Sequence, residues 1–502
     1  MTTVDEVAAF VAGLDLDDRC AAFVGGEVLR SDGDTIDVED PATGKVLVAT
    51  GEAGADLVDR AVLGAAEAFR GPWGTMRHSE RGRALRRVAD LLRENAGMLA
   101  DLESIDTGKP LSQARSDVET SARYFEFYAG VADKNHGETI PTRSDELVYT
   151  VREPYGVVAH VTPWNSPLSQ LCRGAAPSLA CGNTVVVKPS EVTPLSTLVF
   201  ARLLDRSGIL PRDVLTVALG RGPTTGAAVV QHPAVGHIAF TGSVPTGTAI
   251  MTMAAQRMVG CNLELGGKSP TIVLADADLQ KAARAGAAAA IRNSGQSCFA
   301  TTRMLVHSSR YDEFVERCAE EMGNLSVGPG LTDPDLGPLS SGPHLAKVRS
   351  MVEAAVGEGA EVAAGGPDAL DQPTGHFHAP TLLVGVDNAM TIAQNEVFGP
   401  VQSVIRFDDV DEAVAIANDS RYGLAAGVFT NDLTSAHALA GRLEAGQVQI
   451  NRYPAGDVST PFGGYKASGI GREKGVEAMH HYSQLKTVII DLPEERWRGR
   501  TA

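Results

Sequence analysis

The chain has 502 residues, of which 43% are hydrophobic and 21% charged, and its formal net charge is -18. This length predicts two or three domains with sizeable cores. The acidic balance argues against nucleic acid and membranes as partners, because both nucleic acid and anionic membrane attract basic surfaces.

The cysteines and the first residues bear on the compartment. Six cysteines show no C-x-x-C pair and no disulfide-scaffold spacing, and residues 1–18 lack the basic and apolar pattern of a secretory signal. No apolar stretch is long enough to span a bilayer. The acidic clusters, such as Glu320-Glu321, are typical of solvated surface, so we predict no metal site. We expect reduced thiols and a cytoplasmic location.

Taken in chain order, residues 52–134 predict mostly helix, because apolar residues recur at three and four spacing. From Val151, short apolar runs alternate with helices, which is typical of a parallel sheet of Rossmann type. These runs are 156–161, 184–188, 214–218 and 235–240. A second α/β set follows at 270–274, 303–307 and 400–405. The segment 328–344 predicts a surface loop, and 485–490 predicts a late strand that pairs with another element or another subunit.

Two turns flanked by glycine carry a carboxylate and a thiol. They are Glu264-Leu265-Gly266-Gly267-Lys268 and Gly295-Gln296-Ser297-Cys298. A thiolate can attack a carbonyl carbon, and a nearby carboxylate can activate the water that later releases the acyl group. Taken alone, the pair also fits a packing cysteine and a glutamate at the end of a strand.

Nucleotide-binding motifs give a weaker signal. No G-x-G-x-x-G follows the first expected strand, and Gly267-Lys268-Ser269 lacks the earlier glycine of a P-loop because position 262 is Asn. The run from Phe240 to Gly247 follows an apolar strand, and a pyrophosphate can bind at the helix N-terminus expected there.

Seven segments, in the same linear order, resemble the NAD(P)-dependent aldehyde dehydrogenase superfamily from about residue 20 to residue 490. They are Pro163-Trp164-Asn165, Lys188-Pro189-Ser190-Glu191, Phe240-Thr241-Gly242-Ser243, Glu264-Leu265-Gly266-Gly267-Lys268, Gly295-Gln296-Ser297-Cys298, Glu396-Val397-Phe398-Gly399-Pro400 and Pro461-Phe462-Gly463-Gly464-Tyr465-Lys466. The resemblance implies an α/β fold with a Rossmann-type NAD-binding domain (1–134 and 151–263) and a catalytic α/β domain (264–465). It also implies an oligomerisation element (135–150 and 484–502) and a homodimer or homotetramer.

The resemblance assigns roles to four residues. Cys298 is the expected nucleophile, which forms a thiohemiacetal with a small aldehyde and then a thioester. Asn165 is the expected oxyanion donor, together with the backbone N–H of Cys298. Glu264 is the expected base that activates water, so the product is a carboxylic acid. Glu473 is linked in the family with proton transfer.

The same resemblance implies that Lys188 and Glu191 hold the adenosine ribose. A carboxylate there repels a 2'-phosphate, so NAD is expected in preference to NADP. The other cofactor contacts expected are Trp164, Ser190, Gly222, Phe240, Gly242, Ser243, Gly247, Leu265, Glu396 and Phe398.

The substrate pocket departs from the family pattern. Ser166 stands where many relatives have an aromatic residue, and Phe299 follows the nucleophile. Arg173 and Arg292 are placed near the expected tunnel, where a guanidinium can bind a carboxylate-bearing semialdehyde. Alternatively Asp457 neutralises one arginine, and the substrate is a neutral aromatic aldehyde. Phe462 is expected in the same pocket.

Two other functions remain open at this point. Some relatives are structural or binding proteins that have lost the nucleophile, and others pass the acyl group to CoA. This chain keeps Cys298, Glu264 and Asn165 together, which favours an enzyme. CoA-acylating relatives usually lack the base at the position of Glu264, which favours water as the acyl acceptor.

Overall fold

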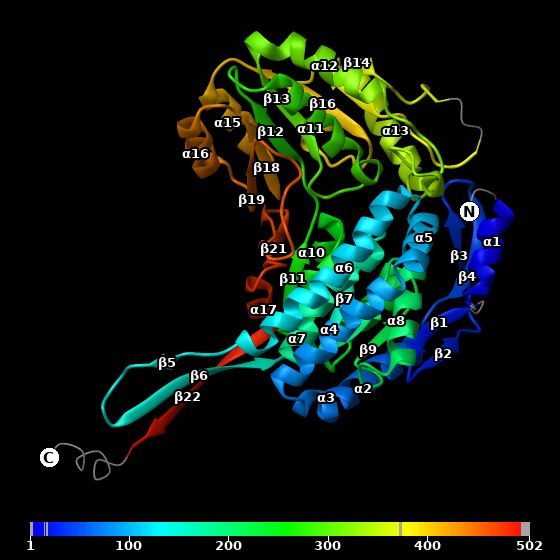
Figure 1. Cartoon of the computed structure of the whole chain (residues 1–502), viewed down its shortest axis with the longest axis vertical. Coiled ribbons are helices and arrows are strands. Elements are labelled where there is room, and N and C mark those ends of the chain that lie inside the picture. The colour runs from blue at the N-terminus through cyan, green and yellow to red at the C-terminus, as the bar shows by residue number, and fades with distance from the viewer. Residues whose placement is uncertain (1–3, 15, 17–18, 371–373, 493–502) are drawn as a thin grey trace.

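Two α/β bodies and a projecting arm make up the protein (Figure 1). The structure is a computed structural model that describes residues 4–14, 16, 19–370 and 374–492. Helix α1 (Val4–Gly13) and the hairpin of β3 (Thr35–Asp40) and β4 (Lys45–Gly51) lie at the N-terminal side.

The first body is built on an eight-stranded sheet in the order β2-β1-β9-β8-β7-β10-β11-β21. Its five central strands are parallel, as the strand and helix alternation predicts. They are β7 (Val157–Val161), β8 (Thr184–Lys188), β9 (Leu215–Ala218), β10 (Val235–Thr241) and β11 (Gly260–Glu264). The edge strands β1 (Cys20–Val24), β2 (Glu27–Arg30) and β21 (Gly469–Ile470) pair antiparallel to their neighbours.

Side chains of the central strands alternate between two buried cores. Val185 and Val187 pack into one core, whereas Val186 packs into the other. This period of two explains why the strand is apolar throughout, because both faces of a parallel sheet are covered. Helices on the first face are α4 (His78–Glu94), α5 (Ala96–Thr107), α6 (Leu111–Val131), α7 (Pro167–Cys181) and α8 (Leu195–Ser207). Helices on the second face are α2 (Ala55–Arg70), α9 (Ala227–Gln231) and α10 (Val244–Gln256).

The helical expectation for residues 52–134 is confirmed by α2, α3 (Pro72–Thr75), α4, α5 and α6. Helix α4 shows the reason: Leu85, Val88, Ala89 and Leu92 are buried at spacings of three and four. They form a stripe toward α6 and α7, and the charged residues between them stay at the surface.

A seven-stranded sheet forms the second body, in the order β14-β15-β16-β13-β12-β18-β19. All neighbours are parallel except β14 and β15. The strands are β12 (Ser269–Val273), β13 (Thr301–His307), β14 (Glu361–Ala364), β15 (Thr381–Val384), β16 (Val401–Phe407), β18 (Ala425–Phe429) and β19 (Gln447–Ile450). The helices are α11 (Leu279–Ile291), α12 (Tyr311–Gly323), α13 (Gly342–Gly357), α14 (Thr391–Gln394), α15 (Val410–Asn418) and α16 (Leu433–Arg442).

The arm is a three-stranded antiparallel sheet that projects from the bodies (Figure 1). It consists of β5 (Thr139–Ile140), β6 (Glu146–Pro154) and β22 (Ser483–Asp491). The late strand at 485–490 is therefore confirmed, and it pairs with β6 of the same chain. Strand β6 continues to Pro154, beyond the predicted end of the element at 150. Residues 493–502 of that element lie outside the described residues.

One further expectation needs correction, and one feature of the fold was not predicted. Residues 336–340 are buried rather than part of a surface loop, and a Cβ at Gly337 would lie 1.8 Å from the backbone oxygen of Gly108. The chain also returns to the first sheet late, because β21 pairs with β11. Local patterns do not reveal either feature, since both depend on contacts between segments far apart in sequence.

Candidate active site

A cavity of about 240 Å³ opens at the carboxyl ends of the first sheet's strands, and both bodies contribute to its lining. In open α/β sheets ligands bind at this edge. The predicted residues that line the cavity are Trp164, Asn165, Gly242, Ser243, Leu265, Cys298, Glu396 and Phe398. Sequence reasoning missed Gln170, His344 and Lys347, which also line it and which stand in none of the seven motifs.

A left-handed turn brings Cys298 to the cavity. Helix α11 ends at Ile291, and Asn293, Ser294 and Gly295 then have φ angles of 52°, 55° and 74°. Two consecutive non-glycine residues in this region are strained, and such strain persists only where the surroundings enforce it. A Cβ at Gly295 would lie 2.1 Å from the backbone of Gly399, so the close approach there requires glycine.

Asn165 lies between the end of β7 and the start of α7, and its side chain reaches the turn before Cys298. Its Nδ2 donates to the backbone oxygen of Gln296 at 2.9 Å. An amide nitrogen carries two hydrogens, so one remains for another acceptor. Asn293 Nδ2 donates in return to the Asn165 backbone oxygen at 2.6 Å.

Burial controls the charge of the thiol. It raises the pKa of Cys298 to about 12, and the Arg173 guanidinium acts in the opposite direction. Lys474, which sequence reasoning missed, also favours the thiolate. Burial in turn lowers the pKa of Lys474 to about 8. The thiol thus sits beside two cations but needs further activation to ionise near neutral pH.

Glu264 ends β11 and is buried. Burial raises its pKa well above the usual value, and the Glu473 carboxylate raises it further. Neither carboxylate oxygen of Glu264 has a hydrogen-bond partner within the described part of the chain. A carboxylate in this state can take a proton from water. Glu473 forms an ion pair with Arg173, which also donates to Thr241 Oγ1 at 3.3 Å.

At one end of the cavity, Glu396 contacts the Gly-Gly turn after Glu264. Its Oε1 accepts from the backbone N–H of Gly267 at 3.0 Å, and a Cβ at Gly266 would lie 2.3 Å from Oε2. Burial raises the pKa of Glu396 to about 7. Phe398, with φ of 60°, packs edge-on against Trp164 with ring centroids 5.2 Å apart.

The other predicted cofactor residues lie along the same sheet edge. Lys188, the last residue of β8, donates to Glu191 at 2.8 Å. Ser243 caps the N-terminus of α10 by accepting from the Thr246 N–H. Gly247 leaves room for Leu265, which a Cβ would approach to 2.6 Å. Phe240 lies near the end of β10, Ser190 is buried just after β8, and Gly222 starts the short helix η2 (Gly222–Gly226).

Of the predicted substrate-pocket residues, the structure brings Phe299 and Phe462 together, whereas the predicted charged residues pair elsewhere or lie exposed. Arg173 is neutralised by Glu473, whereas Asp457 pairs with Arg123 at 2.6 Å instead. Arg292 is exposed and does not line the cavity. The predicted guanidinium clamp for a substrate carboxylate is therefore not formed, because a buried arginine is paired internally when a carboxylate is in reach.

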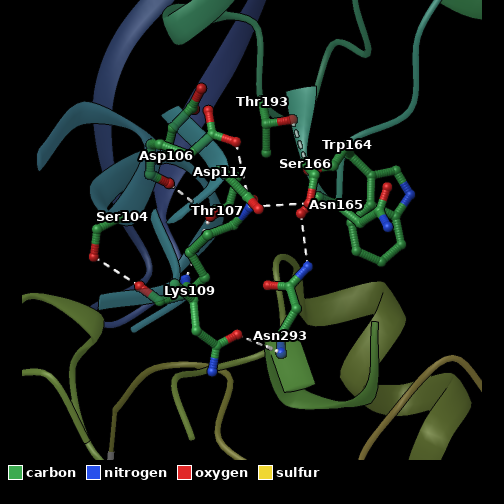
Figure 2. A network of polar contacts seen from close by, with 12 residues as sticks. Ser104, Asp106, Thr107, Lys109, Asp117, Trp164, Asn165, Ser166, Thr193 and Asn293 are labelled. Carbon is green, nitrogen blue, oxygen red and sulfur yellow. Dashed lines mark hydrogen bonds and ion pairs between the residues drawn. The ribbon is translucent and has the colours of Figure 1, made fainter. Parts of the chain in front are cut away.

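Aromatic side chains lie beside the nucleophile instead. The rings of Phe299 and Phe462 pack edge to face with centroids 5.7 Å apart. Arg173 and Lys474 both lie over the Phe462 ring, at 5.5 Å and 5.0 Å. Ser166 turns away into a polar network, where its hydroxyl accepts from Lys109 at 3.0 Å (Figure 2).

A model of the aldehyde dehydrogenase family matches residues 28–488. The Bacillus subtilis protein DhaS is 41% identical over 476 residues, which cover 94% of this chain and 96% of DhaS. The fold and the cavity are those of an α/β enzyme, and these matches identify its family. The chain belongs to the aldehyde dehydrogenase family, and the resemblance found in its seven motifs is confirmed.

Solved structures agree. An aldehyde dehydrogenase from Bacillus cereus in complex with NAD⁺ superimposes with a TM-score of 0.94 and 40% identity, covering 98% of this chain and 100% of that one. Betaine aldehyde dehydrogenase from Staphylococcus aureus, also with NAD⁺, gives a TM-score of 0.92 and 37% identity, covering 95% and 96%. The protein is thus an oxidoreductase that acts on aldehydes.

Two features are absent from the described residues. No helix there combines the length and apolar character that a membrane crossing requires. Nor does that part of the chain contain a group of three histidines, cysteines or carboxylates placed to hold a metal ion.

Proposed function

We propose that this enzyme oxidises an aldehyde to a carboxylic acid, with NAD as hydride acceptor and a thioester on Cys298 as intermediate. One observation carries the proposal. Cys298 and the Asn165 amide line the same cavity, and Glu264 is near enough for its charge to affect the pKa of the Cys298 thiol.

Two features of the cavity suit a dinucleotide. Ser243 and the N-terminus of α10 can face a pyrophosphate, since helix N-termini attract anions. Glu396 can accept from ribose hydroxyls, and the tight contact at Gly266 leaves no room for a side chain there. Solved relatives bind NAD⁺. When bound, NAD supplies the nicotinamide ring that accepts the hydride.

In the acylation step, the Cys298 thiolate attacks the aldehyde carbon and the carbonyl oxygen becomes an alkoxide. The free hydrogen of the Asn165 amide and the Cys298 backbone N–H stabilise this oxygen, and one such donor contributes about 3 kcal/mol. The C–H electron pair leaves as hydride, the C=O bond forms again, and a thioester remains on sulfur.

In the deacylation step, Glu264 takes a proton from water, and the hydroxide adds to the thioester. The C–S bond then breaks, which releases the carboxylic acid and the thiolate. Because Glu264 occupies this position, we favour water over CoA as the acceptor. The Arg173 and Glu473 pair lies beside Glu264 and modulates the charge there.

We expect the Glu191→Ser variant to use NADP better than the unmodified enzyme. The Glu191 carboxylate lies at the Lys188 ammonium, and its charge would repel a 2'-phosphate. Loss of that repulsion should raise kcat/KM for NADP roughly tenfold, which corresponds to about 1.4 kcal/mol. Steady-state kinetics with both cofactors would check this, and an unchanged ratio would place the adenosine ribose elsewhere.

For the substrate, we favour an aldehyde with an apolar or aromatic body. Phe299 directly follows Cys298 and packs against Phe462, whereas the arginines expected to bind a carboxylate are paired or exposed. Aromatic side chains offer a large apolar contact surface, which a neutral apolar substrate can cover.

We also propose that the arm mediates a homodimer or a dimer of dimers. Strand β22 exposes Leu485, Ile489 and Ile490, at 56%, 66% and 40%. An exposed apolar strand is a surface for pairing with another chain. Sedimentation of the Ile489→Lys variant measures its oligomeric state. An oligomer of unchanged size would show that this face of the arm does not mediate association. We also propose a cytoplasmic location, because the cysteine spacing is not that of a disulfide scaffold.

The experiment that tests the proposed activity incubates the enzyme with NAD and aliphatic, aromatic and carboxylate-bearing aldehydes. Absorbance of the reduced cofactor reports turnover, and we expect the highest kcat/KM for aromatic aldehydes. Turnover that requires CoA and yields acyl-CoA would favour the acylating alternative. NAD binding without turnover of any aldehyde would favour the non-catalytic alternative.

A further inference from the structure

A buried cation lies beside the loop that carries Asn165 (Figure 2). Lys109 follows the left-handed Gly108 that ends α5, and only 1% of its surface is exposed. Its Nζ donates to Glu103 Oε1 at 3.3 Å, to Asp117 Oδ2 at 2.6 Å and to Ser166 Oγ at 3.0 Å. An ammonium has three hydrogens, so each can serve one partner.

Burying this ammonium and its carboxylates is unfavourable in free energy if it only stabilises the fold. Although burial opposes its charge, the carboxylates of Asp117 and Glu103 raise the pKa of Lys109 above its usual value, so it stays a cation. Taking such charges out of water costs several kcal/mol per ion, and apolar residues of similar volume often stabilise a core as well. A buried charge cluster is therefore better explained by a need for defined positions.

The loop 164–166 is held from three directions. Lys109 binds Ser166 from the α5 side, and Thr193 Oγ1 donates to the Trp164 backbone oxygen at 2.9 Å. Asn293 Nδ2 donates to the Asn165 backbone oxygen from the cysteine turn (Figure 2). Among these contacts, only the one from Lys109 is charge-assisted, and such bonds are about twice as strong as neutral ones.

The end of α5, just before Lys109, is also connected to the turn that carries Cys298. Ser340 Oγ donates to the backbone oxygen of Thr107, two residues before Lys109. The backbone N–H of Ser340 donates to Gln296 Oε1 at 2.9 Å, and the backbone oxygen of Gln296 accepts from Asn165. The end of α5 is thus connected to both sides of the Asn165 contact.

We propose that Lys109 is a positioning residue for the oxyanion donor, acting through Ser166 on the Asn165 amide. The proposal rests on the proposed function. It gives Ser166 a role that differs from a pocket wall: the small hydroxyl is required because it accepts from Lys109, and an aromatic ring could not. Displacement of Asn165 by a fraction of an ångström would weaken alkoxide stabilisation without removing the amide.

The test is a double-mutant cycle with Ser166→Ala and Asn165→Ala. The measured quantity is the rate at which the first equivalent of reduced NAD forms at saturating aldehyde. This rate reports acylation. We expect Ser166→Ala alone to slow it about tenfold or more, and Ser166→Thr, which keeps the hydroxyl, to recover most of the loss. In the Asn165→Ala background, removal of the Ser166 hydroxyl should change the rate less than twofold.

Two additional variants distinguish an effect on the position of Asn165 from an effect on the stability of the fold. Lys109→Met should slow the first turnover at least as much as Ser166→Ala. Ser121→Ala is the matched control, because this buried hydroxyl donates to the Asp117 backbone at 2.7 Å without touching 164–166. It should lower the melting temperature with little change of rate. If Lys109→Met fails to fold, the double-mutant cycle of Ser166 and Asn165 still tests the positioning role.

The outcomes distinguish this inference from the function on which it rests. Equal effects of Ser166→Ala with and without Asn165 would overturn the positioning role while leaving aldehyde oxidation intact. An unmodified enzyme that forms no reduced NAD with any aldehyde would overturn both.

Discussion

Replacing Cys298 with alanine should abolish aldehyde oxidation, with a loss on the order of 10⁴-fold or more in kcat. A nucleophile that forms the covalent intermediate cannot be replaced by the remaining donors, and comparable nucleophile knockouts cost this much or more. The side chain lines the cavity without filling it, so the variant should bind NAD with nearly unchanged affinity. Titration of cofactor binding alongside steady-state kinetics checks both expectations.

The matched control is Cys318→Ala. This thiol is buried in α12, away from the cavity, and donates to Gln402 Oε1 at 3.2 Å. The variant should lose some stability and keep its kcat. Residual turnover above one hundredth in Cys298→Ala would contradict a covalent mechanism at this thiol.

The Glu264→Gln variant should acylate but release its product slowly. One equivalent of reduced NAD per active site should form in a burst, and the following steady-state rate should be about 10²-fold to 10⁴-fold lower. The reason is that glutamine fills the same space but cannot take a proton from water. Stopped-flow absorbance separates the burst from the steady state.

The pH dependence gives an independent check of Glu264. Because its pKa is raised, the base is protonated at low pH and gains its active form as pH rises. The deacylation rate of the unmodified enzyme should therefore rise with pH through that raised pKa, and Glu264→Gln should lose the rise. Hydroxylamine, which attacks a thioester without a base, should restore turnover. A variant without a burst would instead place Glu264 in acylation.

The sequence motifs located much of the cavity because each is local. Cys298 is placed by a turn whose glycine is irreplaceable, and Glu264 by the end of an apolar strand. Such features depend on a few neighbouring residues, so they can be recognised in the chain.

Contacts between distant segments could not be predicted in this way. The pairing of Arg173 with Glu473 joins α7 to the return of the chain near β21, and no periodicity links the two. The same holds for Ser166, which the family pattern places in the pocket, whereas its hydroxyl accepts from Lys109 after α5. A local motif can be recognised in the sequence. The partner of a buried charge cannot, because tertiary packing decides which distant residue lies beside it.

Mass spectrometry of the Glu264→Gln variant after incubation with NAD and an aromatic aldehyde tests the thioester most directly. We expect the chain to gain the mass of the aldehyde less two hydrogens, and peptide mapping to place the acyl group on Cys298. Reduced NAD formed without any covalent adduct, or an adduct confined to another cysteine, would contradict a thioester on Cys298.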